Sequence, residues 1–371
     1  MTTALNPSLF VAAQRAAVGD VPLIGPGTLT VLAVISLALL VVAFVHAGAA
    51  LMYRQRAGAR GARYERLTAH WNPEIVAFLF ENRTAQDVQK IVASEDQLLF
   101  VNALLQYSRR VDGDELVRIR ELAAPFLPLI ASRLRSRSAA VRARAIQTLG
   151  ELGLMSYVHE IVAALDDPSP LVSIIASRVL CDPNSVDYLP EVLGRLSRFR
   201  SWTPTFLASM LASAGSLGTH ALRAALWDND LDDTSRRIAA DALRELNDFR
   251  AAGAAAHVLG QGGERGLVVA ALRLLGHVGQ EVNLAEVLEK IEDPDFVVRV
   301  AAVDALAALG GRPELERLQG LLYHDPSRWV ALHAARGLLD AGHTAALRTL
   351  AHGEHERAPI GAQVLAESGR R

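Results

Sequence analysis

The segment DPDFVVRVAAVDALAALG, residues 293–310, decides the fold of this chain. Asp-Pro at its start predicts a turn that opens a helix, because Asp caps free amides and Pro presets φ in the first turn. Gly310 predicts the helix end, since the αL backbone costs Gly nothing. Between them, apolar residues recur at steps of three and four, as one buried helix face requires. This face comprises Val298, Ala301, Ala302, Ala305, Leu306 and Leu309.

The same pattern repeats along the chain. Clear copies are SRSAAVRARAIQTLGELG (136–153), DPSPLVSIIASRVLCDPN (167–184) and HDPSRWVALHAARGLLDAG (324–342). The residues that close successive copies are Gly153, Asn184, Gly215, Asn247, Gly279, Gly310 and Gly342. Their spacing is 31 or 32 residues throughout, and Gly369 would close a shortened further copy. A period of this length is the sequence signature of a solenoid.

Each repeat holds a second amphipathic segment ahead of its turn, such as NLAEVLEKIE (283–292). Two helices of this size cannot bury their apolar faces alone, so neighbouring pairs must stack. We therefore predict an all-α fold, a right-handed α-solenoid of helix pairs over residues 136–371, preceded by one transmembrane helix. Residues 71–135 lack the period, and we expect a helical N-terminal cap or docking segment there.

Two helix starts are predicted within this cap. Trp71-Asn72-Pro73 predicts one, which would run through Phe80, because Pro suits the first turn of a helix. The segment Ser94–Val111 predicts a longer helix, which Ser94 and Gln97 would open as a capping box.

The full repeat pattern D-P-x-x-x-V-R-x-A-A-x-x-A-L-x-x-L-G stands in Asp293–Gly310. It resembles the HEAT-repeat superfamily in its short form, the units of roughly 30 residues found in phycobilisome-lyase-type proteins. The resemblance covers residues 136–342 and extends more loosely over 343–371. It implies a solenoid whose second helices line a concave face. It also implies protein binding as the usual activity of such solenoids. The fold alone does not determine which protein is bound, because function depends on the residues of a particular site.

A long uncharged segment lies ahead of the repeats, from Val21 to Tyr53. Its core is TLTVLAVISLALLVVAFVHAGAALMY, residues 28–53. Roughly 20 apolar residues in a helix cross the ~30 Å of bilayer hydrocarbon, so this core predicts a transmembrane helix. Two alternatives are a cleaved secretory leader, because Ala47-Gly48-Ala49 resembles a signal-peptidase site, and a buried helix of a soluble protein.

Five arginines follow this segment and form a basic collar within a juxtamembrane linker, residues 54–70. They are Arg54, Arg56, Arg60, Arg63 and Arg66. Flanks rich in Lys and Arg stay in the cytoplasm, which predicts a short extracytoplasmic tail over residues 1–27. The sequence therefore predicts a single-pass protein of the bacterial inner membrane, with its N-terminus outside and its solenoid in the cytoplasm.

Composition restricts the partners. The formal net charge is −2, and the collar is basic, so the rest of the chain is acidic. An acidic body lacks the electrostatic footprint of a nucleic-acid-binding protein. The single cysteine, Cys181, excludes an internal disulfide and suits a reducing cytoplasm, and we expect it to be a small buried hydrophobe.

No catalytic motif is organised in the sequence, and we predict no catalytic residue, no metal and no cofactor. The best metal candidates are near the C-terminus, and a solvated helix end is the alternative for them. They are His343, His352, His355, Glu354 and Glu356. Deoxyhypusine hydroxylases, which share short HEAT repeats, carry His-Glu pairs at equivalent repeat positions. His159-Glu160 and His355-Glu356 do not occupy such positions.

One set of polar residues follows the period, six positions before each closing residue, and we call it the polar column. Its members are Gln147, Arg178, Ser209, Asp241, Arg273, Asp304 and Arg336. Stacked repeats would align them along one face of the second helices. The column is either a solvated stripe or a groove of alternating charge that binds a partner. We take Gln147, Arg178, Asp241, Arg273, Asp304 and Arg336 as the partner-binding candidates.

Two further sets stand out. Arg142, Arg236 and Arg299 occupy the V-R position of the pattern, where we expect them to pair with Asp residues of neighbouring repeats. Trp202, Trp227 and Trp329 lie in loops or at helix starts. Their side chains either pack partly into the core or anchor an interface with a partner protein.

These observations predict a non-catalytic, membrane-anchored scaffold or regulatory subunit that binds a protein partner, itself membrane-associated, at the cytoplasmic face of the inner membrane. An anchor raises the local concentration of a groove and its partner. By resemblance, proteins of this layout look like accessory subunits of envelope machinery, for example polysaccharide glycosyltransferase complexes. The alternatives are a HEAT-type enzyme, similar to the lyases or metal hydroxylases, and an adaptor for a soluble signalling protein.

Overall fold

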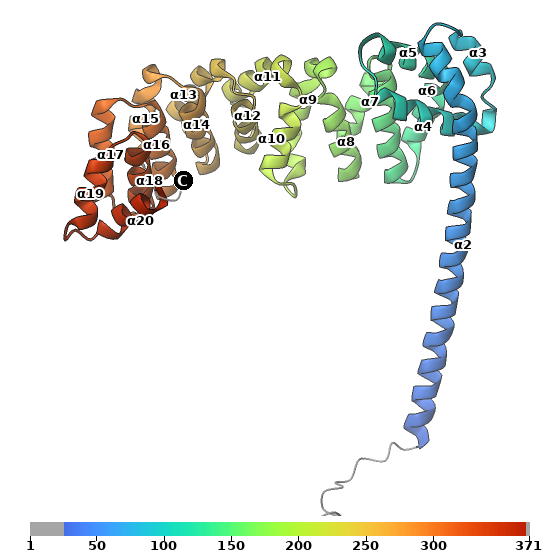
Figure 1. Ribbon diagram of the computed structural model, residues 1–371, viewed down its shortest axis with the longest axis horizontal. Helices are drawn as coiled ribbons and strands as arrows, with labels where there is room; N and C mark the ends of the chain where they lie inside the picture. Colours follow the sequence, from blue (N-terminus) through green and yellow to red (C-terminus); the bar gives the residue numbers. More distant parts are fainter. Residues whose placement is uncertain (1–25, 369–371) are drawn as a thin grey trace, which may run out of the picture. The chain divides into compact units, whose positions relative to one another are not determined.

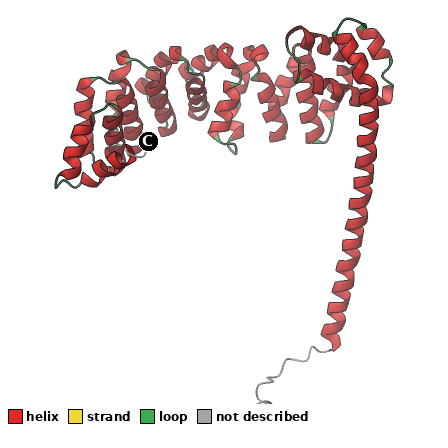
Figure 2. Ribbon diagram, in the orientation of Figure 1, coloured by secondary structure: helices red, strands yellow, loops and turns green. Residues whose placement is uncertain are grey.

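The computed structural model describes residues 26–368, and every regular element among them is a helix (Figures 1 and 2). The chain divides into two compact units, Met1–Arg83 and Thr84–Arg371. The predicted all-α class is therefore confirmed for the described residues. The predicted tail, residues 1–27, lies almost entirely outside them.

The first unit contains one long helix, α2 (Pro26–Leu79). It passes through the predicted linker 54–70 and through Pro73, so the prediction of a separate helix opening at Trp71 was wrong. The physical reason is that the collar is rich in Ala and Arg, which are strong helix formers. Pro73 removes only one backbone hydrogen bond from a helix that is already established on both sides.

Among the residues whose side chains are described, no helix is long and apolar enough to cross a membrane. The predicted span 28–53 falls partly outside these residues, because the side chains described within it form an unbroken run only over 34–48. In that run the large apolar side chains are exposed, for example Phe44. The side chains of Arg56 and Arg60 also lie outside the description, whereas Arg54, Arg63 and Arg66 are exposed.

The second unit begins with three helices that precede the repeats: α3 (Ala85–Lys90), α4 (Gln97–Ser108) and α5 (Gly113–Ala123). The helix predicted from Ser94 is shorter than expected. A 3-10 turn occupies Ser94–Asp96, and neither it nor α4 has a side-chain cap, so the predicted capping box does not form.

Helix pairs then follow one another to the end of the described chain. One row, the outer helices, consists of α6 (Leu127–Ser132), the second half of α7 (Ala139–Ala163), α9 (Leu189–Leu193), α11 (Gly215–Trp227), α13 (Ala252–Gln261), α15 (Leu284–Lys290), α17 (Arg312–His324) and α19 (Thr344–His352). The other row, the inner helices, consists of the first half of α7, α8 (Pro170–Leu180), α10 (Pro204–Ala212), α12 (Asp233–Glu245), α14 (Arg265–Val278), α16 (Phe296–Leu309), α18 (Arg328–Asp340) and α20 (Ala358–Ser368).

Consecutive inner helices pack against each other along the inside of the curved second unit from α7 to α8 and from α10 to α20, whereas α8 meets the next repeat mainly through α9 and the 3-10 turn Leu196–Phe199 (Figure 1). Helix α7 serves two repeats because it kinks at Gly153. The last pair, α19 and α20, confirms the further repeat that Gly369 suggested. The repeat architecture is thus an α-solenoid, as predicted; its handedness stays a prediction.

The predicted apolar face forms the core between layers. Leu306 and Ala302 are fully buried on α16, as are the equivalent residues of neighbouring inner helices. Small residues allow these helices to approach closely: a Cβ atom on Gly337 of α18 would lie 2.7 Å from the Cβ of Ala307 on α16. Close helix packing explains how a chain with only 5% aromatic residues builds a dense core.

Two details of the repeat boundary differ from prediction. Gly310 is extended, with φ −80° and ψ 155°, rather than αL. Glycine is required there because a Cβ would lie 2.5 Å from Cβ of Glu314. The Asp-Pro pairs shape the turn before the helix rather than its first turn. Asp167 Oδ1, for instance, accepts a hydrogen bond from the Ser169 amide at 2.8 Å, and α8 begins one residue later.

Arginines at the V-R position link consecutive repeats, which confirms the predicted pairing at two of three positions. Arg142 donates two hydrogen bonds to the Asp167 carboxylate, both at 2.8 Å. Arg299 donates two to Asp325, at 2.9 and 3.1 Å, and this pair is nearly inaccessible to solvent. Bidentate geometry makes such pairs specific in direction as well as strong. We call them the inter-repeat ion pairs.

Arg236 departs from this rule. The position equivalent to Asp167 and Asp325 is Gly262, so no carboxylate is present there. Arg236 donates instead to the Leu226 carbonyl at 3.0 Å and approaches Asp233 of its own helix at 3.4 Å.

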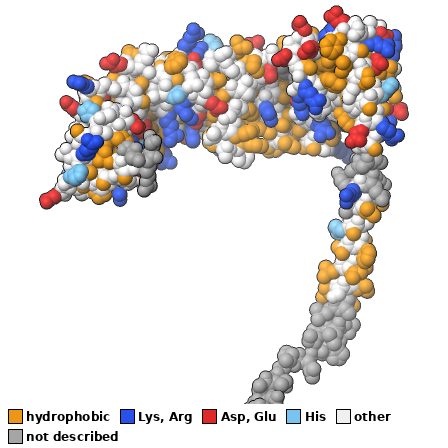
Figure 3. Space-filling model, viewed as in Figure 1, with side chains coloured by type: hydrophobic (Ala, Val, Ile, Leu, Met, Phe, Trp, Pro, Cys, Tyr) orange, Lys and Arg blue, Asp and Glu red, His pale blue; other side chains and the backbone are white. Residues whose placement is uncertain are grey.

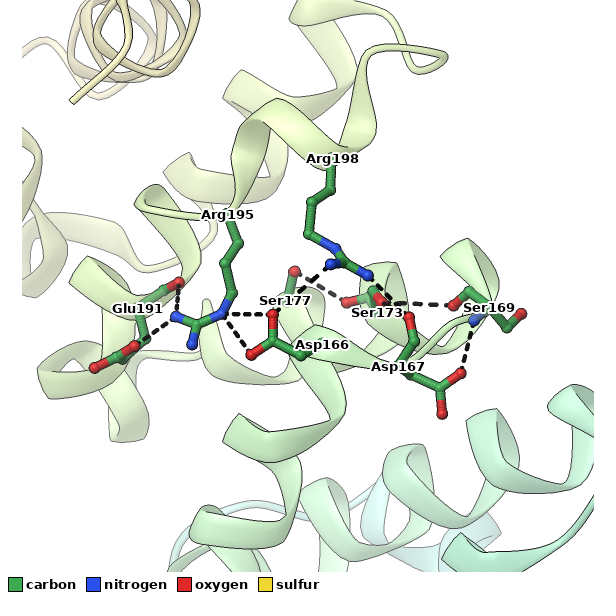
Figure 4. A network of polar contacts seen from close by, with 8 residues as sticks. All are labelled: Asp166, Asp167, Ser169, Ser173, Ser177, Glu191, Arg195 and Arg198. Carbon is green, nitrogen blue, oxygen red and sulfur yellow. Dashed lines mark hydrogen bonds and ion pairs between the residues drawn. The ribbon is translucent and has the colours of Figure 1, made fainter.

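A second layer of contacts reinforces the turn that contains Asp167 (Figure 4). From the next repeat, Arg198 donates to the Asp167 carbonyl at 3.0 Å, and Arg195 binds the neighbouring Asp166 carboxylate at 3.0 Å. Ser173 of α8 donates to the same carbonyl at 3.1 Å. Arg357 makes the contact equivalent to that of Arg198 near the C-terminus, because it donates to the Asp325 carbonyl at 2.8 Å.

Leu306→Asp should destabilise the protein by roughly 4 kcal/mol, because it puts an unpaired carboxylate into an inter-repeat core. Asp304→Ala, half a turn away on the exposed side, should change stability by less than about 1 kcal/mol, since it breaks only a surface contact. Chemical denaturation followed by circular dichroism compares the two. Equal losses would contradict the assigned helix face.

Acid should weaken the inter-repeat ion pairs. The hydrogen bonds from Arg142 hold the pKa of Asp167 below its ordinary value. The charged form therefore contributes stability that is complete above about pH 4 and is lost as pH falls towards the lowered pKa. Asp167→Asn should lower the melting temperature at pH 7 and reduce its further fall between pH 4 and pH 2. Asp166→Asn, which breaks a more exposed pair, is the matched control and should leave that fall unchanged.

Candidate functional site

The structure places the whole polar column on the inner helices, where every member is exposed or half-buried. Gln147 lies on α7, Arg178 on α8, Ser209 on α10 and Asp241 on α12; Arg273, Asp304 and Arg336 follow on α14, α16 and α18. The period therefore aligned one residue per layer along the concave side. What the sequence did not reveal is which of these groups remain available to a partner.

Three members are bonded to the next repeat. Ser209 donates to Glu245 at 2.9 Å, Asp304 pairs with His333 at 2.7 Å, and Arg336 pairs with Glu367 at 3.2 Å. Each partner lies about one repeat further along the chain. Part of the predicted alternating charge is thus satisfied within the solenoid. Asp304 and Arg336, two of the partner-binding candidates, are therefore already paired within the solenoid.

Other members keep unsatisfied charge. Within the described chain, the guanidinium groups of Arg178 and Arg273 make no hydrogen bond or ion pair, and both side chains are exposed. Burial raises the pKa of Asp241, although the neighbouring Arg244, Arg237 and Arg273 oppose this shift. The inner face is therefore richest in available positive charge at Arg178 and Arg273.

A pocket of about 310 Å³ opens on the inner face where α4, α5, α7 and α8 meet. Arg178 and Gln147, two members of the column, line it together with Arg109, Arg120 and Glu151. A Cβ on Gly150, which lines the pocket, would lie 2.3 Å from a side-chain carbon of Val179. Glycine at this position therefore allows α7 and α8 to pack closely beneath the pocket. The sequence period gave no sign of this pocket because α4 and α5 lie outside the repeats.

Exposed apolar residues accompany the column two helical turns earlier. Leu171, Trp202 and Trp329 stand at one equivalent position, thirteen residues before a closing residue, and are 46%, 36% and 60% exposed. The ring of Trp202 stacks on Phe206 with 5.0 Å between centroids. Figure 3 shows hydrophobic side chains gathered around α7 and α8, with basic side chains beside them. The period could have identified this row, since it follows the same spacing as the column.

Trp227 differs from the other two tryptophans. It ends the outer helix α11 and stacks on His257 of α13, with 4.0 Å between centroids. It therefore connects two outer helices while remaining partly exposed.

The C-terminal histidines take local roles. His352 bonds the Arg348 carbonyl at 2.7 Å, and His355 accepts from the Arg357 amide at 3.1 Å while its ring meets the edge of Tyr323. Among the described residues, no three His, Cys, Asp or Glu side chains are grouped to hold a metal ion. Cys181 is fully buried, and burial raises the pKa of its thiol to about 12. It is thus the small buried hydrophobe that the sequence predicted.

The comparisons with known proteins agree with this architecture. Residues 261–339 match the family of HEAT repeats. No curated protein matches the sequence. The predicted resemblance to HEAT repeats is therefore supported over residues 261–339.

Several solved structures are similar to this chain. The complex of CpcE and CpcF of phycocyanin lyase from Nostoc sp. PCC7120 is 21% identical over 65% of this chain and 87% of that one, with a TM-score of 0.32. The karyopherin Kap121p bound to the extreme C-terminus of the protein phosphatase Cdc14p is 16% identical over 76% and 39%, with a TM-score of 0.44. Human deoxyhypusine hydroxylase is 19% identical over 75% and 98%, with a TM-score of 0.31. These likenesses concern the helical solenoid fold alone.

Proposed function

We propose that this protein is a non-catalytic scaffold or regulatory subunit whose concave inner face binds a partner protein. The observation that carries the proposal is the combination of arginines without a hydrogen bond or ion pair on the inner helices and exposed aromatic rings on or just ahead of these helices. Arg178 and Arg273 lie in the polar column, and Trp202 and Trp329 lie in the apolar row beside it. Buried aromatic and arginine anchors supply most of the energy of protein interfaces.

The form of this face also favours a macromolecular partner. The column has one member on each inner helix from α7 to α18, and the apolar row adds exposed side chains on α8, just ahead of α10 and on α18, so these groups are distributed over several layers. A small molecule would contact one layer or two, whereas a protein segment can contact several. The inter-repeat ion pairs fix two of the boundaries between layers, which lowers the cost of ordering there on binding.

We extend the proposal to membrane attachment through residues 28–53, with the solenoid on the cytoplasmic side of the bacterial inner membrane. Its support is the uncharged sequence of this segment and the exposure of the described apolar side chains between Val34 and Val45 of α2. Exposed apolar surface of this kind needs a cover, and the following arginines favour cytoplasmic orientation. A membrane-associated partner, such as a subunit of an envelope glycosyltransferase complex, fits this arrangement.

Partner binding is tested with a photo-crosslinking amino acid at Ala308 on the exposed side of α16. In living cells this position should give a discrete adduct with one protein, because it adjoins the polar column. Arg273→Glu should reduce the adduct several-fold, since a charged interface contact becomes repulsive. The same crosslinker at Glu289, on the outer helix α15, is the matched control and should give no such adduct.

The opposing outcome is equally specific. If no adduct forms from Ala308, and the paired change of His352 and His355 to Ala abolishes an enzymatic turnover of the purified protein, then the scaffold proposal fails. The enzyme alternative would take its place.

Membrane attachment is tested with topology reporters on the full chain. A reporter fused after Arg371 should be active in its cytoplasmic form only, and a cysteine introduced at Ser8 should react with an impermeant reagent from outside. The protein should stay in the membrane fraction after a carbonate wash. Release by the wash, or periplasmic activity of the reporter, would contradict this part of the proposal.

A further inference from the structure

The pocket between α4, α5, α7 and α8 has a defined charge pattern. Arg109 donates two hydrogen bonds to the Glu151 carboxylate, at 3.2 and 3.0 Å, and Gln147 donates a third at 3.2 Å. Glu151 is thus fully engaged by the wall of the pocket itself. Its backbone carbonyl accepts a further bond from Arg120 Nε at 3.2 Å, which fixes the direction of that guanidinium.

The second carboxylate of the pocket is also engaged. Asp182 accepts from the Asn184 amide at 2.9 Å and from its side chain at 2.7 Å, so it closes a turn after α8. Arg178, by contrast, is exposed and has no bonded partner within the described chain. Three arginines against two carboxylates leave one positive charge, and the donors still available are those of Arg178 and the terminal nitrogens of Arg120.

This balance selects a singly charged anion. A carboxylate accepts two parallel N–H donors from a guanidinium and cancels one positive charge. A phosphate carries close to two negative charges at neutral pH and would leave an excess beside Glu151 and Asp182. The apolar side chains of Leu116, Ile175 and Val179 line the remainder of the pocket and suit the methylene groups of a glutamate.

An apolar anchor site lies at a fixed distance from Arg178. Leu171 precedes it by seven residues on α8, which corresponds to about 10 Å along a helix axis. Leu171 is 46% exposed, and the equivalent position of the next repeat is Trp202, whose ring stacks on Phe206. An extended peptide covers about 10 Å in three residues.

We propose that the pocket binds an acidic side chain of an extended partner segment, and that a large apolar side chain three residues away packs on Leu171. This inference rests on the proposed function and specifies its partner. The partner segment would carry a glutamate or aspartate and a large apolar residue three positions apart. The acidic residue would lie at the C-terminal end of α8, near Arg178, and the apolar residue at its N-terminal end, near Leu171. Charge complementarity at Arg178 and Arg120 distinguishes it from a basic segment.

The test uses the full-length protein in detergent micelles and a displayed library of random twelve-residue peptides. Selected peptides should share an acidic and a large apolar residue three positions apart. Binding of one such peptide is then measured against its Glu→Gln analogue. The wild-type protein should prefer the glutamate form by roughly tenfold, as expected for a charge-assisted hydrogen bond.

Variants of the protein locate the contact. Arg178→Gln should abolish the preference for glutamate over glutamine, and because Arg178 is exposed and unpaired, it should leave the melting temperature unchanged. Arg250→Gln, which changes an exposed arginine outside the column, is the control and should keep the preference. Leu171→Ala should weaken both peptides alike.

The outcomes separate the two proposals. Peptides that bind without discriminating glutamate from glutamine, or a preference that survives Arg178→Gln, would overturn the pocket and leave the binding face intact. A phosphoserine analogue that binds more tightly than the glutamate peptide would overturn the argument for a single negative charge. Failure to select any peptide, together with no crosslinked adduct at Ala308, would remove the proposed function itself.

Discussion

The inter-repeat ion pair between an arginine on one inner helix and an aspartate in the next turn is the constraint on which the solenoid depends. Arg299 and Asp325 show it most clearly, because both are nearly buried and joined by two hydrogen bonds. Removing one partner would leave an uncompensated charge, which costs far more than the pair gains. The pair therefore specifies how the two repeats it joins meet, and the same holds for Arg142 and Asp167.

This register determines the composition of the inner face. Once consecutive layers are aligned, residues separated by about one repeat come within bonding distance, as Ser209 and Glu245 or Arg336 and Glu367 do. Three of the seven members of the polar column are thus bonded to the next repeat. Arg178 and Arg273 remain without a partner in the described chain, so the same register that stabilises the fold also selects the groups offered for binding.

The repeat around Arg236 shows how the fold tolerates loss of the pair. Gly262 replaces the aspartate, and Arg236 turns back to the Leu226 carbonyl. The connection between repeats is kept by another bond: the Glu264 amide donates to the Asp233 carboxylate at 2.6 Å. A backbone donor has thus replaced the guanidinium, and an aspartate of the preceding repeat has replaced that of the following one.

The sequence by itself determined the repeat, the two helices of each unit and the buried face, because helical periodicity and the spacing of closing residues are local properties. It also placed Arg178 and Arg273 on a common face. Tertiary structure decided the rest. The helical pattern led to the wrong reason for Gly310. Glycine is needed there because Glu314 packs where a Cβ would lie, not because the backbone has a positive φ. It could not reveal the pocket at Arg178, since Arg109 and Arg120 come from helices outside the period. Nor could it tell paired from unpaired members of the polar column, because that depends on side chains one layer away.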